Sequence, residues 1–496
     1  MVLKNAAAGG AGGFPKQVYL VGIKGTGMCA LAELLHNLGA KVSGSDTAEV
    51  FYTDSILREL GIPYHETFDA SHIASGNSAP DLLVYSAAYA PDANAEIAEA
   101  QKMGIRIQKF PDALGEYSAS FDSTAIAGVH GKTTTTALAG TILRGAGVPA
   151  QVLVGSAVSA FGDRSTLIIG NKYFVAETCE YKRHFLSFCP RRIIITSIES
   201  DHQDYYPAYS DIMEAFLEFG RKLPPDGELI YCADDPGAVE AAETIKKEKP
   251  GLKTTPYGFS AGGDFGIEKY EAKNERIIIK LRFFPDELKL RVPGRHTALN
   301  AAGAMALASS IVRQEYGDEG WNKKRREGVI RALEEFCGSR RRSEILGEAG
   351  GILFMDDYGH HPTAIKTTLA GLKEFYPERR LVLSFMSHTY TRTAALLDEF
   401  AASFEGADIL LLHKIYSSAR EKYDGGVTGR TLFEKVKNLP GWEGRAFYED
   451  EPDDAVDFAK TVLKPKDLFV TMGAGNNWTL GKKLFDHYAG KNGETK

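Results

Sequence analysis

The stretch Thr124-Ala-Ile-Ala-Gly-Val-His-Gly-Lys-Thr-Thr-Thr-Thr136 decides the fold of this chain. It begins as a short apolar strand, breaks at Gly128 and Gly131, and continues through threonines into a helix. A sharp turn before a helix leaves backbone N–H groups pointing into one concavity, where the helix dipole also favours an anion. In such loops a lysine at the position of Lys132 reaches the outer phosphates, and a hydroxyl at Thr133 holds magnesium. The stretch therefore predicts a nucleotide-phosphate loop.

The spacing of this loop departs from the usual pattern. That pattern needs a glycine at position 126, where this chain has Ile126, so the loop is shortened to Gly128-x-x-Gly131-Lys-Thr133. An ordinary strand-to-helix turn is the alternative interpretation of such a motif taken alone.

Two apolar strands that follow the loop end on side chains able to bind a metal ion. The strand Lys172 to Ala176 is followed by Glu177, and Arg192 to Ile198 is followed by Glu199-Ser-Asp-His202. The carboxyl ends of parallel strands meet at one edge of a sheet, so we expect Glu177 and His202 to approach the phosphate loop. This joint pattern favours the phosphate loop over an ordinary turn.

The composition is that of a globular protein. With 496 residues, the chain has the length of about three domains. Its net charge of -7 gives no support to a nucleic-acid partner. Five cysteines without C-x-x-C spacing indicate free thiols in a reducing cytoplasm. Neither a signal peptide nor an apolar run long enough for a membrane span is found in the sequence, and we expect a cytoplasmic location.

A second glycine-rich turn lies near the N-terminus. The strand Gln17 to Gly22 runs into Gly22-Ile-Lys-Gly-Thr-Gly27, a helix is predicted from Cys29 to Leu38, and the strand Lys41 to Ser45 ends at Asp46. Glycines that admit a pyrophosphate and an acid that takes a ribose hydroxyl make up the dinucleotide fingerprint. The glycine spacing here differs from that fingerprint and gives little support to a nicotinamide cofactor, whereas the diphosphate of another nucleotide fits the same physics.

The segments that follow the second glycine turn extend the α/β pattern. The strand Asp81 to Ala87 carries Ser86 at its C-terminal end, where open sheets present ligand groups. Phe110 to Phe121 is interpreted as a hinge, and Glu228 to Val292 as short strands and turns.

The C-terminal part alternates strands and helices. Strands are predicted at Ile352–Met355, Leu381–Phe385, Ile409–Leu412 and Leu468–Thr471, with helices after Pro362 and from Thr393. Strands separated by helical segments indicate parallel βαβ units. Polar loops follow three of these strands, namely Asp356-Asp-Tyr-Gly-His-His-Pro362, Ser387-His-Thr-Tyr-Thr-Arg-Thr393 and Gly473-Ala-Gly-Asn476.

Taken together, these motifs resemble those of the Mur ligase family, from Val18 to about Leu484. The motifs that carry the resemblance are Gly22-Ile-Lys-Gly-Thr-Gly-Met28, Ser43-Gly-Ser-Asp46, Ala127-Gly-Val-His-Gly-Lys-Thr-Thr-Thr-Thr136, Asp356-Asp-Tyr-Gly-His-His-Pro362 and His388-Thr-Tyr-Thr-Arg-Thr393. The resemblance implies an α/β fold of three domains: a Rossmann-like UDP-binding domain, a central P-loop ATPase domain and a C-terminal Rossmann-like domain. The expected bounds are a flexible tail at 1–14, the UDP-sugar domain at 15–116, the ATP domain at 117–336 and the amino-acid domain at 337–496.

The resemblance also implies the activity. We expect an ATP-dependent ligase that joins L-alanine to the lactyl carboxylate of UDP-N-acetylmuramate through an acyl phosphate, at the first step of peptidoglycan stem-peptide synthesis. Its cofactors would be ATP and Mg²⁺ or Mn²⁺, and it would act as a monomer or weak homodimer.

Site residues follow from the same resemblance. The ATP site is expected to contain Gly128, His130, Gly131, Lys132, Thr133, Thr134, Asn300, Arg342 and Asp357. The UDP-sugar site is expected to contain Gly25, Thr26, Gly27, Asp46 and Ser86. The metal ligands are expected to be Thr133, Glu177 and His202. The catalytic residues are expected to be Lys132, His202, Arg342, Asp357, His361, His388 and Arg392, the last as a holder of the alanine carboxylate.

Two departures from the family pattern stand out. Thr297 replaces an asparagine that usually follows Gly-x-His, and the segment after Glu177 is less acidic than in relatives, with Glu180 left to supply a carboxylate.

Three other functions remain open. A recycling ligase would add a tripeptide to the same UDP-sugar, although Arg420-Glu-Lys422 and the His388 to Thr393 motif favour the alanine enzyme. A ligase of the folylpolyglutamate branch would leave the N-terminal domain unexplained. A non-catalytic nucleotide- or UDP-sugar-binding relative should have lost Lys132, Glu177 or His202, and all three are present.

Overall fold

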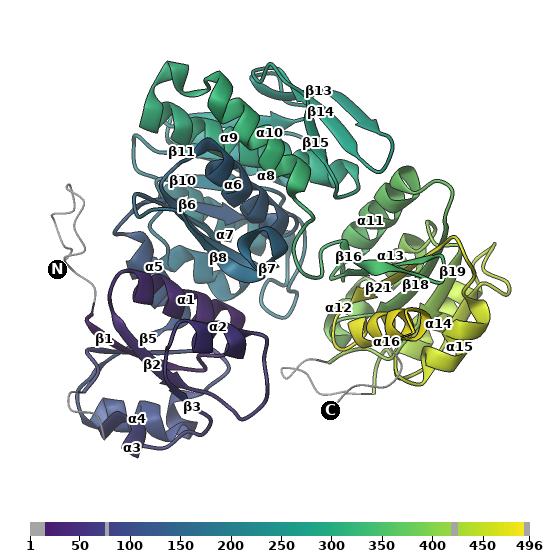
Figure 1. The fold of residues 1–496 in the computed structure, drawn as a ribbon, viewed down its shortest axis with the longest axis horizontal. Coiled ribbons are helices and arrows are strands. Elements are labelled where there is room, and N and C mark those ends of the chain that lie inside the picture. The colour runs from purple at the N-terminus through teal and green to yellow at the C-terminus, as the bar shows by residue number, and fades with distance from the viewer. Residues whose placement is uncertain (1–14, 75–78, 418–424, 491–496) are drawn as a thin grey trace. The chain divides into compact units, whose positions relative to one another are not determined.

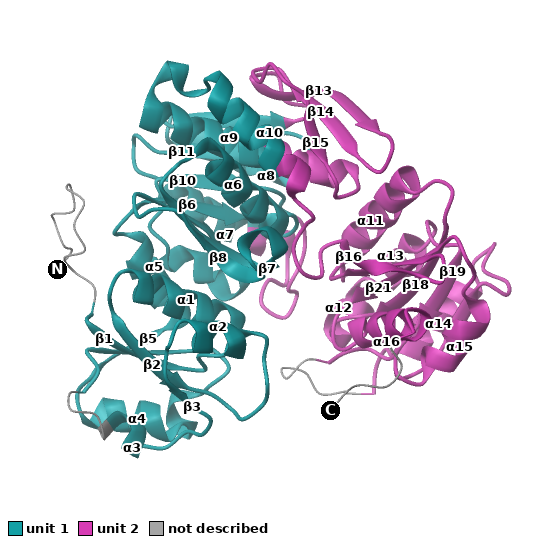
Figure 2. Cartoon of the chain, in the orientation of Figure 1, with its two compact units in different colours: residues 1–198, 213–257, 303–332 teal, residues 199–212, 258–302, 333–496 magenta. Residues whose placement is uncertain are grey.

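The computed structural model describes residues 15–74, 79–417 and 425–490. The expected tail at 1–14 and the loop Arg420-Glu-Lys422 lie outside the described residues. The chain divides into two compact units (Figure 2): unit 1 comprises residues 1–198, 213–257 and 303–332, and unit 2 comprises residues 199–212, 258–302 and 333–496. Within both units helices alternate with strands, as expected for an α/β protein.

The first sheet of unit 1 is parallel, with strand order β3-β2-β1-β4-β5. Figure 1 labels β1, β2, β3 and β5 of this sheet. Its strands are β1 (Gln17–Val21), β2 (Lys41–Ser45), β3 (Tyr64–His65), β4 (Leu82–Tyr85) and β5 (Arg106–Lys109). Its helices are α1 (Thr26–Asn37), α2 (Thr53–Glu59), α3 (Ser71–Ala74), η1 (Pro91–Ala93), α4 (Ala95–Lys102) and α5 (Phe110–Ser118). Strand β1 lies at the centre, where Val18 pairs with Val42 on one side and Leu82 on the other. The loop that leaves β1 therefore opens at the carboxyl edge of the sheet.

The second sheet of unit 1 has the order β12-β11-β10-β6-β9-β7-β8, parallel except for the hairpin β7–β8. Its strands are β6 (Asp122–Ala127), β7 (Ala150–Val158), β8 (Arg164–Ile168), β9 (Tyr173–Glu177), β10 (Arg192–Ile195), β11 (Glu228–Cys232) and β12 (Lys253–Gly258). The helices of this region are α6 (Lys132–Ala146), η2 (Ser159–Phe161), η3 (Tyr181–Ser187), α7 (Tyr209–Arg221), α8 (Pro236–Glu248), α9 (Arg295–Tyr316), η4 (Asp318–Gly320) and α10 (Lys323–Glu335). Strand β6 lies between β10 and β9, so the loop it feeds into α6 is flanked by both strands.

Unit 2 contains an antiparallel arrangement of β13 (Phe265–Ala272), β14 (Ile277–Leu281) and β15 (Leu288–Leu290). It also contains a sheet of order β16-β17-β21-β18-β19-β20, parallel except at β16. Its strands are β16 (Glu344–Ala349), β17 (Ile352–Asp357), β18 (Arg380–Met386), β19 (Ile409–Leu412), β20 (Ala446–Tyr448) and β21 (Asp467–Gly473). Its helices are α11 (Pro362–Phe375), α12 (Tyr390–Ala395), α13 (Leu397–Ser403), α14 (Gly429–Lys437), α15 (Ala455–Val462) and α16 (Trp478–Tyr488).

Most predicted strands are confirmed, and β2 and β19 have the predicted bounds. One segment interpretation was wrong, because the expected strands and turns from Glu228 to Val292 include helix α8. The expected hinge at Phe110 to Phe121 contains helix α5. Both helices carry proline in their first turn, a position where its fixed φ suits a helix and its missing N–H costs nothing.

Candidate active site

The loop between β6 and α6 is held in a backbone conformation that requires glycine. Gly128 and Gly131 have φ values of 139° and 80°. A Cβ at Gly128 would lie 2.0 Å from the Thr196 hydroxyl, which donates to the carbonyl of Ala127 at 3.1 Å and to that of His130. The turn is therefore closed tightly onto the end of β10.

Part of the loop backbone is also bonded to this neighbouring segment. The N–H of Val129 donates to the carbonyl of Ser197 at 3.0 Å, and the N–H of His130 donates to the Ser197 hydroxyl at 2.9 Å. These two N–H groups fix the shape of the loop. The helix dipole of α6, which begins at Lys132 directly after the left-handed Gly131, favours an anion at the same place.

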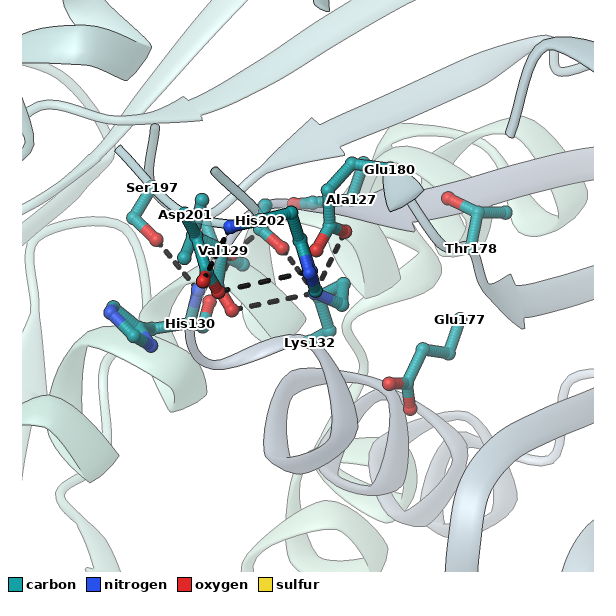
Figure 3. A network of polar contacts seen from close by, with 12 residues as sticks. Ala127, Val129, His130, Lys132, Glu177, Thr178, Glu180, Ser197, Asp201 and His202 are labelled. Atoms are coloured by element: carbon teal, nitrogen blue, oxygen red, sulfur yellow. Dashed lines mark hydrogen bonds and ion pairs between the residues drawn. The ribbon is translucent and has the colours of Figure 1, made fainter. Parts of the chain in front are cut away.

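Lys132 lies against an acidic partner (Figure 3). Its Nζ donates to Glu180 Oε2 at 2.9 Å and to the carbonyl of Gly128. Burial works against the charged form, but Glu180, with Cys179 and Glu177, outweighs it and raises the pKa of the Lys132 ammonium. Lys132 is therefore a cation at neutral pH, and its ammonium lies beside the carbonyl of Gly128 in the loop.

Glu177 stands at the end of β9 beside the first turn of α6. Its Oε1 accepts from the Thr133 hydroxyl at 3.0 Å, and its Oε2 accepts from the N–H of Gly155 at 2.7 Å. A Cβ at Gly155 would lie 2.6 Å from Oε2, so only glycine lets β7 approach this closely. The structure thus brings Thr133 and Glu177 together, as expected from the sequence.

The structure assigns Glu180 a partner that the sequence did not reveal. Its side chain is 3% exposed and forms an ion pair with Lys132 at 2.9 Å. The carboxylate expected from Glu180 thus contacts Lys132, at the start of α6.

The glycine-rich turn after β1 forms a short loop at the N-terminus of α1. Gly25 is the residue that precedes the helix, its N–H donates to the carbonyl of Gly22 at 3.1 Å, and Thr26 and Gly27 form the first turn. A Cβ at Gly27 would lie 2.9 Å from the ring of Phe110. The Thr26 hydroxyl accepts from the Tyr52 hydroxyl at 3.2 Å.

Asp46, expected to contact the nucleoside, is buried and already serves as an acceptor. It accepts from the N–H of Lys24 at 2.7 Å, from the N–H of Thr47 at 2.8 Å and from the Tyr89 hydroxyl at 3.0 Å. Ser86 lies on the neighbouring strand end, where its N–H donates to the carbonyl of Val21 at 3.0 Å. Asp46 therefore shapes the loop after β1.

Sequence reasoning missed the role of Lys24 in this loop. Its side chain is fully buried and forms ion pairs of 3.1 Å with both Asp54 and Glu66. Burial disfavours its charge, but the hydrogen bonds and charges of the two carboxylates outweigh that cost and raise the pKa of Lys24. The position of a lysine inside a glycine-rich turn was the signal in the sequence that could have indicated this role.

In unit 2, Arg392 lies on α12 and is 5% exposed. Its Nε and Nη2 donate to Asp201 Oδ1 at 3.1 and 2.6 Å, and its Nη1 lies 3.0 Å from His388 Nδ1. Burial would raise the pKa of Asp201, but Arg392 and His202 lower it below the ordinary range. Arg392 and His388 are thus together, as expected, with Asp201 as an unexpected third member.

His202 itself adopts a left-handed conformation, with φ of 54°. Its N–H donates to Asp201 Oδ1 at 2.7 Å, and its carbonyl accepts from Tyr205 and Tyr206, each at 2.8 Å. Non-glycine residues in this conformation cluster at functional sites because the surroundings must compensate for the strain.

The arginine run before β16 contains Arg342, which was expected at the ATP site without a predicted side-chain partner. Arg341, rather than Arg342, donates to Asp356 at 2.9 Å, while Arg342 lies over the ring of Tyr358 at 5.2 Å. Asp357 accepts from the N–H of Ser343 at 2.7 Å. Arg341 and Ser343, on either side of Arg342, have φ values of 60° and 48°. Arg341 also lies over the Tyr358 ring, at 5.0 Å, so the two arginines differ in the contact with Asp356, which a run of three arginines cannot indicate.

His361 is 6% exposed, and its Nδ1 lies 3.5 Å from Glu199 Oε1. Thr297 is fully buried, and its hydroxyl donates to the carbonyl of Pro293 at 2.7 Å, so it closes the first turn of α9. Asn300 follows on the same helix and is also buried.

Two broader expectations concern cysteines and membrane spans. All five cysteines are free, as expected. Among the described residues, no helix has the length and apolar character that crossing a bilayer requires.

Family models match most of the chain in succession. They are the Mur ligase family, catalytic domain, at residues 17–122; the Mur ligase middle domain at 126–308; and the Mur ligase, glutamate ligase domain, at 341–475.

Comparison with individual proteins leads to the same family as these models. The chain is 50% identical, over 95% of its length and 96% of the relative's, to the UDP-N-acetylmuramate–L-alanine ligase of Treponema pallidum (strain Nichols). The crystal structure of a UDP-N-acetylmuramate-alanine ligase from Thermotoga maritima matches with a TM-score of 0.73 and 26% identity, covering 96% of this chain and 100% of that one. A murein peptide ligase from Psychrobacter arcticus matches with a TM-score of 0.64 and 25% identity, covering 97% and 100%.

The phosphate loop with Lys132, the Thr133–Glu177 pair and the second glycine loop thus occur in a chain that these proteins resemble over nearly its full length. The chain belongs to the Mur ligase family, whose members are ATP-dependent ligases that form amide bonds.

Proposed function

We propose that this chain joins L-alanine to the lactyl carboxylate of UDP-N-acetylmuramate with cleavage of ATP to ADP and phosphate. The observation that carries the proposal is the 50% identity, across 95% of the chain, with a relative named for this reaction. In the first step a carboxylate oxygen attacks the γ-phosphorus and ADP leaves, which gives an acyl phosphate. In the second step the alanine amine attacks the acyl carbon, the amine loses a proton, and phosphate leaves.

Lys132 and α6 are proposed to bind the triphosphate. The ammonium of Lys132 and the N-terminus of α6 both favour the charge that builds up on phosphate oxygens during transfer. ATP has to compete with Glu180 for Lys132, because the two side chains are 2.9 Å apart. His130, Thr134, Asn300, Arg342 and Asp357 remain proposed contacts of the nucleotide.

Thr133 and Glu177 are proposed to hold Mg²⁺, which Mn²⁺ can replace. Hydroxyl and carboxylate oxygens are the donors that these ions prefer, and the N–H of Gly155 keeps the carboxylate in place. The ion would neutralise phosphate charge when bound. His202 is proposed as a ligand of a second ion.

Gly25, Thr26 and Gly27 are proposed to take the diphosphate of the UDP-sugar, because the loop precedes a helix and its glycines admit close approach. His361, His388 and Arg392 are proposed to line the amino-acid site. Domain bounds of 15–116, 117–336 and 337–496 are part of the proposal, as are a cytoplasmic location and a monomeric or weakly dimeric state.

A phosphate-release assay tests the function. The protein is given ATP, Mg²⁺ and UDP-N-acetylmuramate, together with L-alanine, glycine, L-serine or the stem tripeptide in parallel. We expect release that requires both the UDP-sugar and an amino acid, fastest with L-alanine.

Two outcomes would contradict the proposal. Faster release with the tripeptide would identify the recycling ligase instead; the Psychrobacter arcticus relative is named a murein peptide ligase. An equal rate without any amine would exclude amide formation as the source of phosphate.

A further inference from the structure

Helix α1 carries the proposed diphosphate loop at its start and a buried carboxylate further along. Glu33 is 8% exposed and lies in the part of α1 that packs against β7 and β8. At 1.5 Å per residue, Glu33 lies about 10 Å along the helix from Thr26. A buried carboxylate is costly unless it is paired, so its partners indicate what it holds.

Both oxygens of Glu33 are bound by β8. Arg164 Nη1 donates to Oε1, and the Thr166 hydroxyl donates to Oε2. Arg164 also reaches Glu59 at 2.7 Å, but the Glu59 side chain is 72% exposed. The same arginine thus joins one buried and one exposed carboxylate of the N-terminal region.

Strand β8, which binds Glu33, pairs with β7, and β7 contacts the proposed metal ligand Glu177. Thr166 pairs with Leu153 on β7, and two residues further along β7 the N–H of Gly155 donates to Glu177 at 2.7 Å. Glu177 in turn accepts from the Thr133 hydroxyl at 3.0 Å. A continuous set of contacts within unit 1 therefore connects the loop of α1 with the start of α6.

Other polar contacts hold the same two parts together. Asn37 at the end of α1 donates to Asn171 at 3.1 Å, and Asn171 also accepts from Gln151 of β7 at 2.7 Å. The hydroxyl of Tyr117 on α5 donates to Gln151 as well. Glu33 differs from these neutral groups because it places a charge across the contact.

We propose that Glu33 is a positioning residue for the ligase reaction: its ion pair with Arg164 fixes α1 on the β7–β8 hairpin and so sets the separation of the UDP-sugar and ATP sites. This inference rests on the proposed function. Glu33 touches neither substrate. It controls where the lactyl carboxylate lies relative to the γ-phosphate, and reacting groups displaced by about 1 Å lose up to about a hundredfold in rate.

The test compares Glu33→Gln and Glu33→Ala with Glu59→Gln, which removes the exposed partner of the same arginine. Steady-state phosphate release gives kcat and the KM of each substrate. Equilibrium binding of UDP-N-acetylmuramate and of ATP is measured separately. Thermal unfolding shows whether each variant is folded at the temperature of the assay.

For Glu33→Gln we expect kcat to fall about tenfold, with the dissociation constants of both substrates within twofold of wild type. Glu59→Gln should keep its kcat within twofold. If Glu33→Ala does not fold, Glu33→Gln decides the question, because it preserves the volume of the side chain.

Unchanged kcat in a folded Glu33→Gln variant would overturn the proposal, as would an equal loss of affinity for both substrates, which indicates general destabilisation. A wild-type protein without alanine-dependent phosphate release would instead refute the proposed function.

Discussion

Arg392 donates from Nε and Nη2 to the same oxygen of Asp201, at 3.1 and 2.6 Å. The two side chains are 5% and 7% exposed, so the pair is removed from water. Arginine suits this arrangement because its planar group presents several donors in fixed directions. A carboxylate of the protein thus occupies donors that the sequence assigned to the carboxylate of alanine.

Replacement of Arg392 by lysine should affect the amino-acid substrate selectively. A lysine offers a compact point charge and cannot keep the contacts with Asp201 and His388 at once. We expect the KM for L-alanine to rise about tenfold, the equivalent of ~1.4 kcal/mol, while the KM for ATP stays within twofold. The exposed Arg430→Lys is the matched control. Equal KM values for L-alanine in wild type and Arg392→Lys would exclude Arg392 from the acceptor site.

Lys132→Ala should lower both the turnover rate and the stability. Loss of a charge that stabilises the transition state costs about 100- to 1000-fold in kcat. Glu180, at 3% exposure, would lose its cation, and a buried carboxylate that loses its ion-pair partner costs about 3 kcal/mol.

The double variant Lys132→Ala/Glu180→Gln separates these two effects. The double variant should regain most of the free energy of unfolding, measured by denaturant titration, while its phosphate release stays as slow as that of Lys132→Ala. A Lys132→Ala protein as stable as wild type would show that the ion pair contributes little.

Gly155→Ala should weaken metal binding. The added methyl group would lie 2.6 Å from Glu177 Oε2, so the carboxylate has to move and the N–H contact from β7 is lost. We expect the Mg²⁺ concentration for half-maximal activity to rise about tenfold, since a carboxylate must be held in place to bind well. Gly251→Ala is the control, because no atom lies within 4 Å of its added Cβ. Identical Mg²⁺ titrations of the two variants would count against Glu177 as a ligand.

Asp356 should make stability depend on pH. Burial raises the pKa of Asp356 to about 6, opposed by Arg341 and Thr471 and assisted by Asp357. The folded state therefore holds a proton that the unfolded state releases near pH 4, so stability is lost as the pH rises from about 4 to about 6. The loss is at most about 3 kcal/mol.

Asp356→Asn should remove this dependence. The measurement is the difference in free energy of unfolding between variant and wild type across this pH range. The difference is needed because burial lowers the pKa of His413 to about 4, and this buried neutral histidine acts with the opposite sign in the same range. A difference that does not change with pH would contradict the raised pKa of Asp356.

The sequence predicted most of the strands of this fold but few of the side-chain partners. Apolar runs such as Ile409–Leu412 mark buried strands without reference to the rest of the chain, and the glycines at 128 and 131 mark the turn between β6 and α6. Thr133 and Glu177, 44 positions apart, could be paired because parallel strands end at one edge.

Other contacts depend on a specific backbone path. Lys132 and Glu180 are 48 positions apart, and the chain directly after Glu180 passes through left-handed Lys182 and Arg183, which no periodicity indicates. The choice of Arg341 over Arg342 as the partner of Asp356 likewise depends on single dihedral angles. The β7–β8 hairpin was not predicted, and because the partners of Glu33 lie on β8, they were missed as well.

The contact between α1 and the β7–β8 hairpin has a consequence for inhibitor design. Both glycine loops belong to unit 1, and Glu33 ties the helix of one to the strands beside the other. A compound that links a uridine-diphosphate mimic to a triphosphate mimic can therefore carry a rigid spacer. Rigid spacers retain affinity that flexible ones lose to conformational entropy. The spacer length that gives the highest affinity would then report the distance between the two sites that α1 maintains.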